Sequence, residues 1–193
     1  PALVLGASFA WNTSDTTLDN LEFLLNEYVF KDTTGNTAKA LLTLGNAYRK
    51  TNIPEGNGNA FHLMLRRYAW TMQGQFQTKL LTKTGLLAAE KEIHNGMNLL
   101  KDAHPTCSDA AIILKEIELS SHLALFGIHL GLARLDAPDM ATKSIPKAKR
   151  DELVGELTPL IESYREVWLV RNREGGLDDS AGKLEEVRDF LRF

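Results

Sequence analysis

Apolar residues recur at the three- and four-residue spacing of an α-helix through almost the whole chain. The period begins near Asp15, where Leu18, Leu21 and Leu25 fall on one helical face, and it continues to Leu191. Loop signals divide the pattern into helices expected at about 15–31, 38–48, 60–72, 83–101, 109–135, 147–168 and 177–191. The sequence therefore predicts an all-α bundle of about seven helices, with antiparallel neighbours joined by short loops.

One short segment departs from this pattern. Residues 3–12 are apolar and are followed at once by turn-forming residues, which predicts a buried β-strand. A lone strand cannot satisfy its own backbone hydrogen bonds, so we expect an orphan strand that pairs with polypeptide outside this sequence, or an extended arm. On this interpretation residues 1–14 are the remnant of a preceding domain, and 15–193 form a helical domain with a sub-boundary near 52–59.

The run 168–180 predicts how the last two helices meet. Arg171 and Arg173 stand where a helix C-terminus favours positive charge, and the glycine pair 175–176 can take the left-handed conformation that ends a helix. Two aspartates and a serine at 178–180 can then cap the next helix.

Two further features bear on how the long helices pack. Ala124, Gly127 and Gly131 are small residues that allow another helix to approach closely. Pro159 lies inside a helical pattern and should kink it, because proline lacks the N–H that would bond to Gly155.

The composition is that of a folded chain without a strongly charged face. Of the 193 residues 44% are hydrophobic, and the formal net charge is −3, so we expect neither nucleic acid nor a membrane as a partner. No apolar run approaches the roughly 20 residues of a spanning helix, and we expect no leader sequence. The chain starts at Pro1, which suggests a processed product or part of something longer. A single cysteine, Cys107, forms no internal disulfide and leaves the cellular compartment open.

Candidate chemistry is sparse. Glu118 and His122 stand four residues apart on a helix, as do Glu90 and His94, and two such pairs on facing helices could hold a metal. Pairs of this kind are more typical of helix surfaces, so we predict no metal and no cofactor.

Two other residues are candidates for a functional role. His129 lies among apolar residues and is interpreted as a core histidine with satisfied nitrogens. Cys107 precedes a helix start, where amide dipoles can activate a thiol, but an unreactive thiol near a turn is the favoured interpretation. No residue of this chain is predicted to be catalytic.

Trp11 follows the predicted strand and precedes a polar turn. A tryptophan at the carboxyl end of a barrel strand points into the mouth of the barrel, and its flat face suits a sugar ring. From the residues alone, a core tryptophan that covers the helices is the favoured interpretation.

Two segments together resemble the C-terminal portion of bacterial family 20 glycoside hydrolases, the β-N-acetylhexosaminidases. Gly6-Ala-Ser-Phe-Ala-Trp-Asn12 is similar to the last strand of that family's (β/α)8 barrel, and the run 168–180 is similar to the end of its helical extension. Residues 30–35 and 44–48 also fit the resemblance.

The resemblance implies an exo-acting parent enzyme that removes terminal N-acetylhexosamine units, with its Asp-Glu pair on an earlier strand outside this chain. Trp11 matches the tryptophan that walls the sugar pocket, and it is the one substrate-binding residue implied here. Family members commonly carry an acid two residues later, where this chain has Thr13, a departure that bears on sugar specificity. The expected partners are the preceding catalytic domain, its carbohydrate substrate and a second copy of the chain.

Two alternatives stay open at this point. The chain could be a self-contained interaction or ligand-sensing module, with grooves beside Gly127 and Gly131 that bind a partner helix or a small ligand. It could also be a metal-binding bundle enzyme that uses the two Glu/His pairs.

Overall fold

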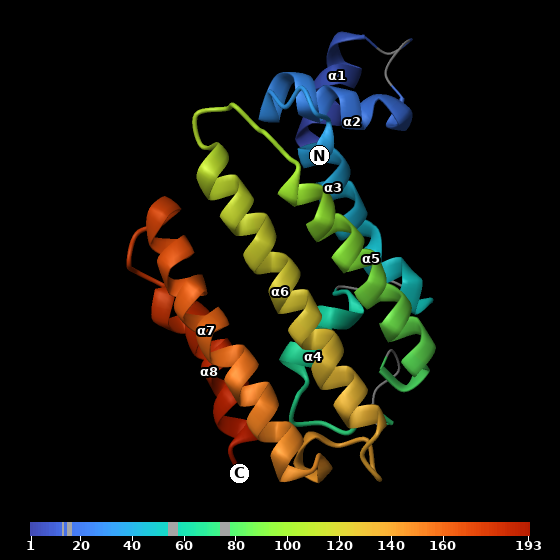
Figure 1. Cartoon of the computed structure of the whole chain (residues 1–193), viewed down its shortest axis with the longest axis vertical. Helices are drawn as coiled ribbons and strands as arrows, with labels where there is room; N and C mark the ends of the chain where they lie inside the picture. Colours follow the sequence, from blue (N-terminus) through green and yellow to red (C-terminus); the bar gives the residue numbers. More distant parts are fainter. Residues whose placement is uncertain (13, 15–16, 54–57, 74–77) are drawn as a thin grey trace.

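The computed structural model describes residues 1–12, 14, 17–53, 58–73 and 78–193. They form an all-α bundle, which confirms the predicted fold class (Figure 1). The α-helices are α1 (Ala2–Trp11), α2 (Leu21–Leu24), α3 (Asn36–Asn46), α4 (Ala60–Arg66), α5 (Lys83–Lys101), α6 (Ala110–Leu135), α7 (Lys147–Arg171) and α8 (Leu177–Leu191). Shorter 3-10 or π segments are η1 (Leu18–Asn20), η2 (Leu25–Phe30), η3 (Ala47–Thr51), η4 (Thr78–Leu80) and η5 (Thr142–Ser144). Within these described ranges no helix is both long and apolar enough to cross a membrane.

The prediction of a strand at residues 3–12 is wrong, because this segment forms helix α1. A helix satisfies its own backbone groups, whereas a lone strand would leave them unpaired. The amide of Leu5 donates to the carbonyl of Pro1 at 3.0 Å, and the amide of Asn12 donates to that of Ser8 at 2.9 Å. No residue of α1 is buried, so this helix adds little to the core.

Helices α5, α6 and α7 are the long elements of the bundle, and each runs antiparallel to its neighbour (Figure 1). Helix α6 packs against both α5 and α7, while α3 packs on α5 and α8 packs on α7. Helix α6 is therefore apolar on more than one side. Leu125 and Ile128 face a core shared with α4 and α5, whereas Phe126 and Leu130 face a core shared with α7 and α8.

Helix α4 crosses α6 at the small residues that the sequence singled out. A methyl group added at Gly127 would lie 2.8 Å from the carbonyl oxygen of Phe61, so only glycine allows this approach. At Gly131 the added methyl would lie 3.1 Å from Leu86 and 3.4 Å from Met64. The prediction that another helix approaches here is confirmed. The predicted partner groove at these glycines is wrong, since α4 and α5 of the same chain fill it.

The predicted helix end near Lys31 is confirmed. Lys31 has a left-handed backbone with φ of 52°, and Asp32 follows as a buried carboxylate at the start of the turn into α3. Its two oxygens accept hydrogen bonds from the amide and hydroxyl groups of Thr34 and Thr37, at 2.6 to 2.9 Å. Burial acts to raise the pKa of Asp32, but these hydrogen bonds outweigh it and lower the pKa to about 2. The predicted cap at Asp15 or Thr16 lies outside the described residues.

The run 168–180 has a structural role at the junction of α7 and α8. Helix α7 ends at Arg171, whose guanidinium donates to Glu116 at 2.6 Å and to Asp109 at 2.9 Å, both next to or on α6. The indole N–H of Trp168 donates to the carbonyl of Arg173 at 3.0 Å and holds the turn against the helix. These contacts link the C-terminal end of α7 to the N-terminal end of α6.

The predicted roles of the glycines and the caps need two corrections. Gly176 is left-handed, with φ of 86°, but it precedes α8 as its N-cap and does not end α7. Asp178 and Asp179 lie in the first turn of α8, where their negative charge interacts favourably with the helix dipole. No side-chain cap hydrogen bond forms there. The glycine conformation thus starts one helix instead of stopping the other.

Candidate functional site

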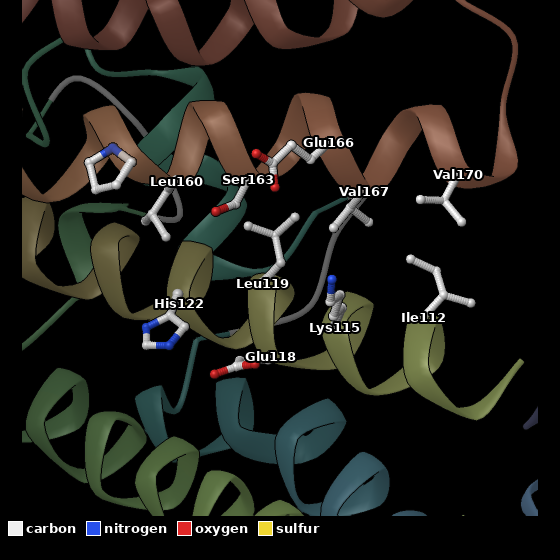
Figure 2. A pocket seen from close by; sticks show the side chains of 11 residues that line it. Ile112, Lys115, Glu118, Leu119, His122, Leu160, Ser163, Glu166, Val167 and Val170 are labelled. Atoms are coloured by element: carbon white, nitrogen blue, oxygen red, sulfur yellow. The ribbon is translucent and has the colours of Figure 1, made fainter. Parts of the chain in front are cut away.

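A groove of about 430 Å³ lies between the facing sides of α6 and α7 (Figure 2). Cavities of about 300–1,000 Å³ are typical of small-molecule sites. Aliphatic side chains supply most of the exposed lining, and polar side chains are spaced among them. The groove is lined by Ile112, Lys115, Glu118, Leu119 and His122 from α6 and by Pro159, Leu160, Ser163, Glu166, Val167 and Val170 from α7.

The groove lies between two polar links that join the same two helices. Toward one end of the bundle, His129 of α6 bonds to Glu156 of α7, at 2.8 Å. Toward the other end, Arg171 of α7 bonds to Glu116 of α6. Pro159 lines the groove between the links and lies inside α7, where it cannot donate a hydrogen bond back along the helix. The kink predicted there stays a prediction. Polar contacts between α6 and α7 thus flank the groove on both sides.

Three charged side chains that line the groove are not engaged in ion pairs within the described part of the chain. Lys115, Glu118 and Glu166 form no ion pair with any residue that the structure describes. In Figure 2 Glu166 and Ser163 extend from α7, while Lys115 extends from α6 toward the space between the helices. Aliphatic walls with a few isolated polar groups are suited to binding an amphipathic molecule.

The predicted Glu/His pairs do not combine into a metal centre. Across the described ranges, no group of three or more His, Cys, Asp or Glu side chains could hold a metal ion. Glu118 and His122 line the groove. The carboxylate of Glu90 contacts His129 and does not pair with His94. The metal-binding alternative therefore has no geometric support in the described part of the chain.

Both ring nitrogens of His129 are satisfied, as predicted, but the prediction that this histidine belongs to the core is wrong, because its side chain is 33% exposed. Nδ1 lies 2.8 Å and 2.9 Å from the two oxygens of Glu156, and Nε2 lies 3.1 Å from Oε1 of Glu90. The hydrogen bond with Glu156 is the main cause that raises the pKa of His129, against the opposing effect of burial, and Glu90 adds to it. Sequence reasoning missed both carboxylates because they lie 27 and 39 residues away on other helices.

Cys107 is half-buried in the turn before α6. Its amide and that of Thr106 both donate to the carbonyl of Phe30, at 3.2 Å and 3.0 Å. The hydroxyl of Thr106 also donates to the carbonyl of Lys31, at 2.8 Å. This turn therefore fastens the start of α6 to the end of η2, which is a structural role.

The N-terminal elements present large apolar side chains to solvent. Trp11, which the resemblance places at the sugar pocket, is 94% exposed at the end of α1, so the interpretation as a core tryptophan is wrong. Leu3 is 90% exposed. Other exposed apolar side chains of these elements are Phe9, Leu18, Phe23 and Tyr28. Thr13, the other position that the resemblance singled out, lies outside the described residues.

The chain was compared with protein-family models, with curated proteins and with solved structures, and none matches. The resemblance to family 20 glycoside hydrolases therefore stays a prediction.

Proposed function

We propose that this chain is a non-catalytic helical domain that packs against the catalytic barrel of an exo-acting, β-N-acetylhexosaminidase-like glycoside hydrolase. Its role is to support the barrel and, through Trp11, to contribute to the rim of the sugar pocket. The resemblance of the two short segments suggests the partner. One structural observation carries the proposal, namely the exposed apolar surface of the N-terminal elements.

Helix α1 is apolar and uncharged, yet it has no buried residue. Burying a large apolar side chain contributes about 1.5–3 kcal/mol relative to leaving it exposed, and clustered exposed apolar groups typically mark an interaction surface. Leu3 and Trp11 are almost fully exposed, so most of this contribution is unused in the chain described here. A neighbouring domain that covers these side chains would recover it.

The coding sequence upstream of Pro1 provides the first test. An Asp-Glu pair at the end of an upstream predicted strand is expected, and an unrelated upstream domain would contradict the proposal. The longer product should hydrolyse an aryl N-acetylglucosaminide, while residues 1–193 alone should not. Turnover by residues 1–193 alone would overturn the assignment.

Replacement of Trp11 tests its place at the pocket in the longer enzyme. Trp11→Ala should raise KM by up to about tenfold, because a contact with an aromatic face contributes about 0.5–1.5 kcal/mol. Leu3→Ala is the matched control, since Leu3 is equally exposed but belongs to the opposite end of the segment. Equal effects of the two variants would place Trp11 away from the sugar.

The groove between α6 and α7 favours a second candidate, a helical ligand-sensing module. Its aliphatic walls should bind the amphipathic probe 1-anilinonaphthalene-8-sulfonate saturably, as measured by fluorescence. Val167→Glu should abolish saturable binding, whereas Leu169→Glu on the exposed side of the same helix should not. Binding that is unchanged by Val167→Glu would exclude the groove as the site.

A further inference from the structure

The imidazole of His129 lies between carboxylates from two different helices. Glu156 of α7 faces Nδ1 at 2.8 Å, and Glu90 of α5 faces Nε2 at 3.1 Å. His129 itself belongs to α6, so the three side chains join the three long helices of the bundle. The side chain of His129 is 33% exposed, and therefore water and protons reach it.

This arrangement requires a charged imidazole. An ionised carboxylate only accepts hydrogen bonds, so both ring nitrogens must carry a proton to bond on both sides. A neutral imidazole has one N–H, and its other nitrogen would direct a lone pair at a carboxylate oxygen. Loss of one proton therefore breaks one of the two contacts and leaves two acidic groups beside an uncharged ring.

The geometry indicates which contact breaks. Nδ1 lies within 2.9 Å of both oxygens of Glu156, whereas Nε2 reaches one oxygen of Glu90 at a longer distance. The remaining proton is therefore held on Nδ1. We propose that His129 is a pH-operated link that fastens α5 to the α6–α7 pair when protonated, and that releases Glu90 and so loosens the junction of α5 with α6 when neutral.

The charged groups on the surrounding elements are consistent with this assignment. Glu90 and Glu156 are the acids in contact with the ring from α5 and α7. Helix α4 also packs on α6, and it carries His62 and Arg66, both of which are exposed. On α5, the neighbouring Lys91 and His94 are exposed as well. The two carboxylates are thus the groups that set the charge state of the ring.

The link joins the two halves of the bundle. Helix α3 packs on α5, and the N-terminal elements α2 and η2 pack on α3. Helix α8 packs on α7. Because hydrogen bonding to Glu156 raises the pKa of His129 above 6.5, the link is intact below pH 6.5 and is lost as the pH rises through the raised pKa. The expected response is a looser junction between α5 and α6 at alkaline pH.

Titration of the imidazole signals of residues 1–193 by NMR tests the charge state directly. The signal that disappears in His129→Gln should titrate above 6.5, and Glu156→Gln should lower its pKa more than Glu90→Gln does. A pKa at or below 6.5 would overturn the proposal. His94→Gln, on the surface of α5, is the matched control and should leave the signal of His129 unchanged.

Hydrogen exchange, corrected for the intrinsic pH dependence of amide exchange, tests the mechanical consequence. Opening of α5 amides around Glu90 should increase between pH 6 and 9, by about tenfold for each unit that contact with Glu90 adds to the pKa of His129. Glu90→Gln should abolish this increase in α5. Because this variant keeps the bond between His129 and Glu156, it tests the link even where His129→Gln does not fold. Equal pH dependence of exchange in the wild-type chain and in Glu90→Gln would refute the link. Refutation of the link would not bear on the proposed barrel-supporting role.

Discussion

Two polar residues of the interior show how a single side chain is stabilised by its local partners. Asp32 is buried, but four donors from two threonines satisfy its carboxylate. Arg134 is fully buried on α6, where it donates to the carbonyl of Trp70 and to the sulfur of Met64. Burial lowers the pKa of Arg134 to about 10, because few polar groups replace its lost hydration. The hydrogen bonds of Asp32 therefore allow a prediction of how its replacement changes the free energy of unfolding.

Asp32→Asn should lower the free energy of unfolding at pH 7 by about 1–3 kcal/mol, because an amide NH₂ cannot accept the bonds that one carboxylate oxygen receives. The folded pKa of about 2 lies below the unfolded value of 3.8, so the contribution of Asp32 is present above 3.8 and is lost as the pH falls toward 2. Urea denaturation at pH 7 and pH 2 should therefore show a smaller difference between variant and wild type at the lower pH. Asp19→Asn, an exposed aspartate in η1, should change neither value by more than about 0.5 kcal/mol.

At the scale of elements, the approach of α4 to α6 depends on backbone contact at a glycine. A methyl group at Gly127 meets the backbone of Phe61, which cannot move away as a flexible side chain could. Gly182 of α8 offers the opposite case, since a methyl group there meets nothing within 4 Å. Substitution of Gly127 therefore tests tertiary packing, whereas substitution of Gly182 tests helix propensity alone.

Gly127→Ala should destabilise the fold by about 1–3 kcal/mol through overpacking, despite the better helix propensity of alanine. Gly182→Ala should stabilise it by about 0.5–1 kcal/mol. Thermal or urea unfolding of both variants measures the difference. If the two substitutions shift stability in the same direction, the close crossing of α4 and α6 is incorrect.

At the scale of the whole molecule, the two ends of the chain contribute unequally to stability. The core consists of packed side chains of α3 to α8, with Leu25 and Phe30 adding a smaller cluster near α3. Helix α1 lies outside these cores apart from a partial contact of Val4. Its exposed side chains are therefore available to another domain at little cost to the bundle.

Deletion of residues 1–11 should change the free energy of unfolding by less than about 1 kcal/mol, because no side chain of α1 is buried. Leu25→Ala, at a side chain that is 2% exposed, should cost about 2–5 kcal/mol. Urea denaturation of both variants measures these values. Loss of folding on deletion of residues 1–11 would show that α1 belongs to the bundle core.

The sequence by itself determined the long helices. The limits predicted for α5 are those observed, and α6, α7 and α8 differ from their predicted limits by a few residues at most. Amphipathic period and turn residues are local signals, and they suffice wherever an element buries one side against its neighbours. The buried stripe Leu184, Val187 and Leu191 of α8 is such a case.

Only the tertiary structure decided the rest. The groove between α6 and α7 and the link at His129 join residues far apart in the sequence, and no local pattern specifies which side chains will meet. The helix at residues 2–11 is a further case, because a short apolar run does not by itself distinguish a strand from a helix. No second strand that could pair with it is present among the described residues. Local spacing determines which elements form, whereas packing over long separations determines which side chains become a site.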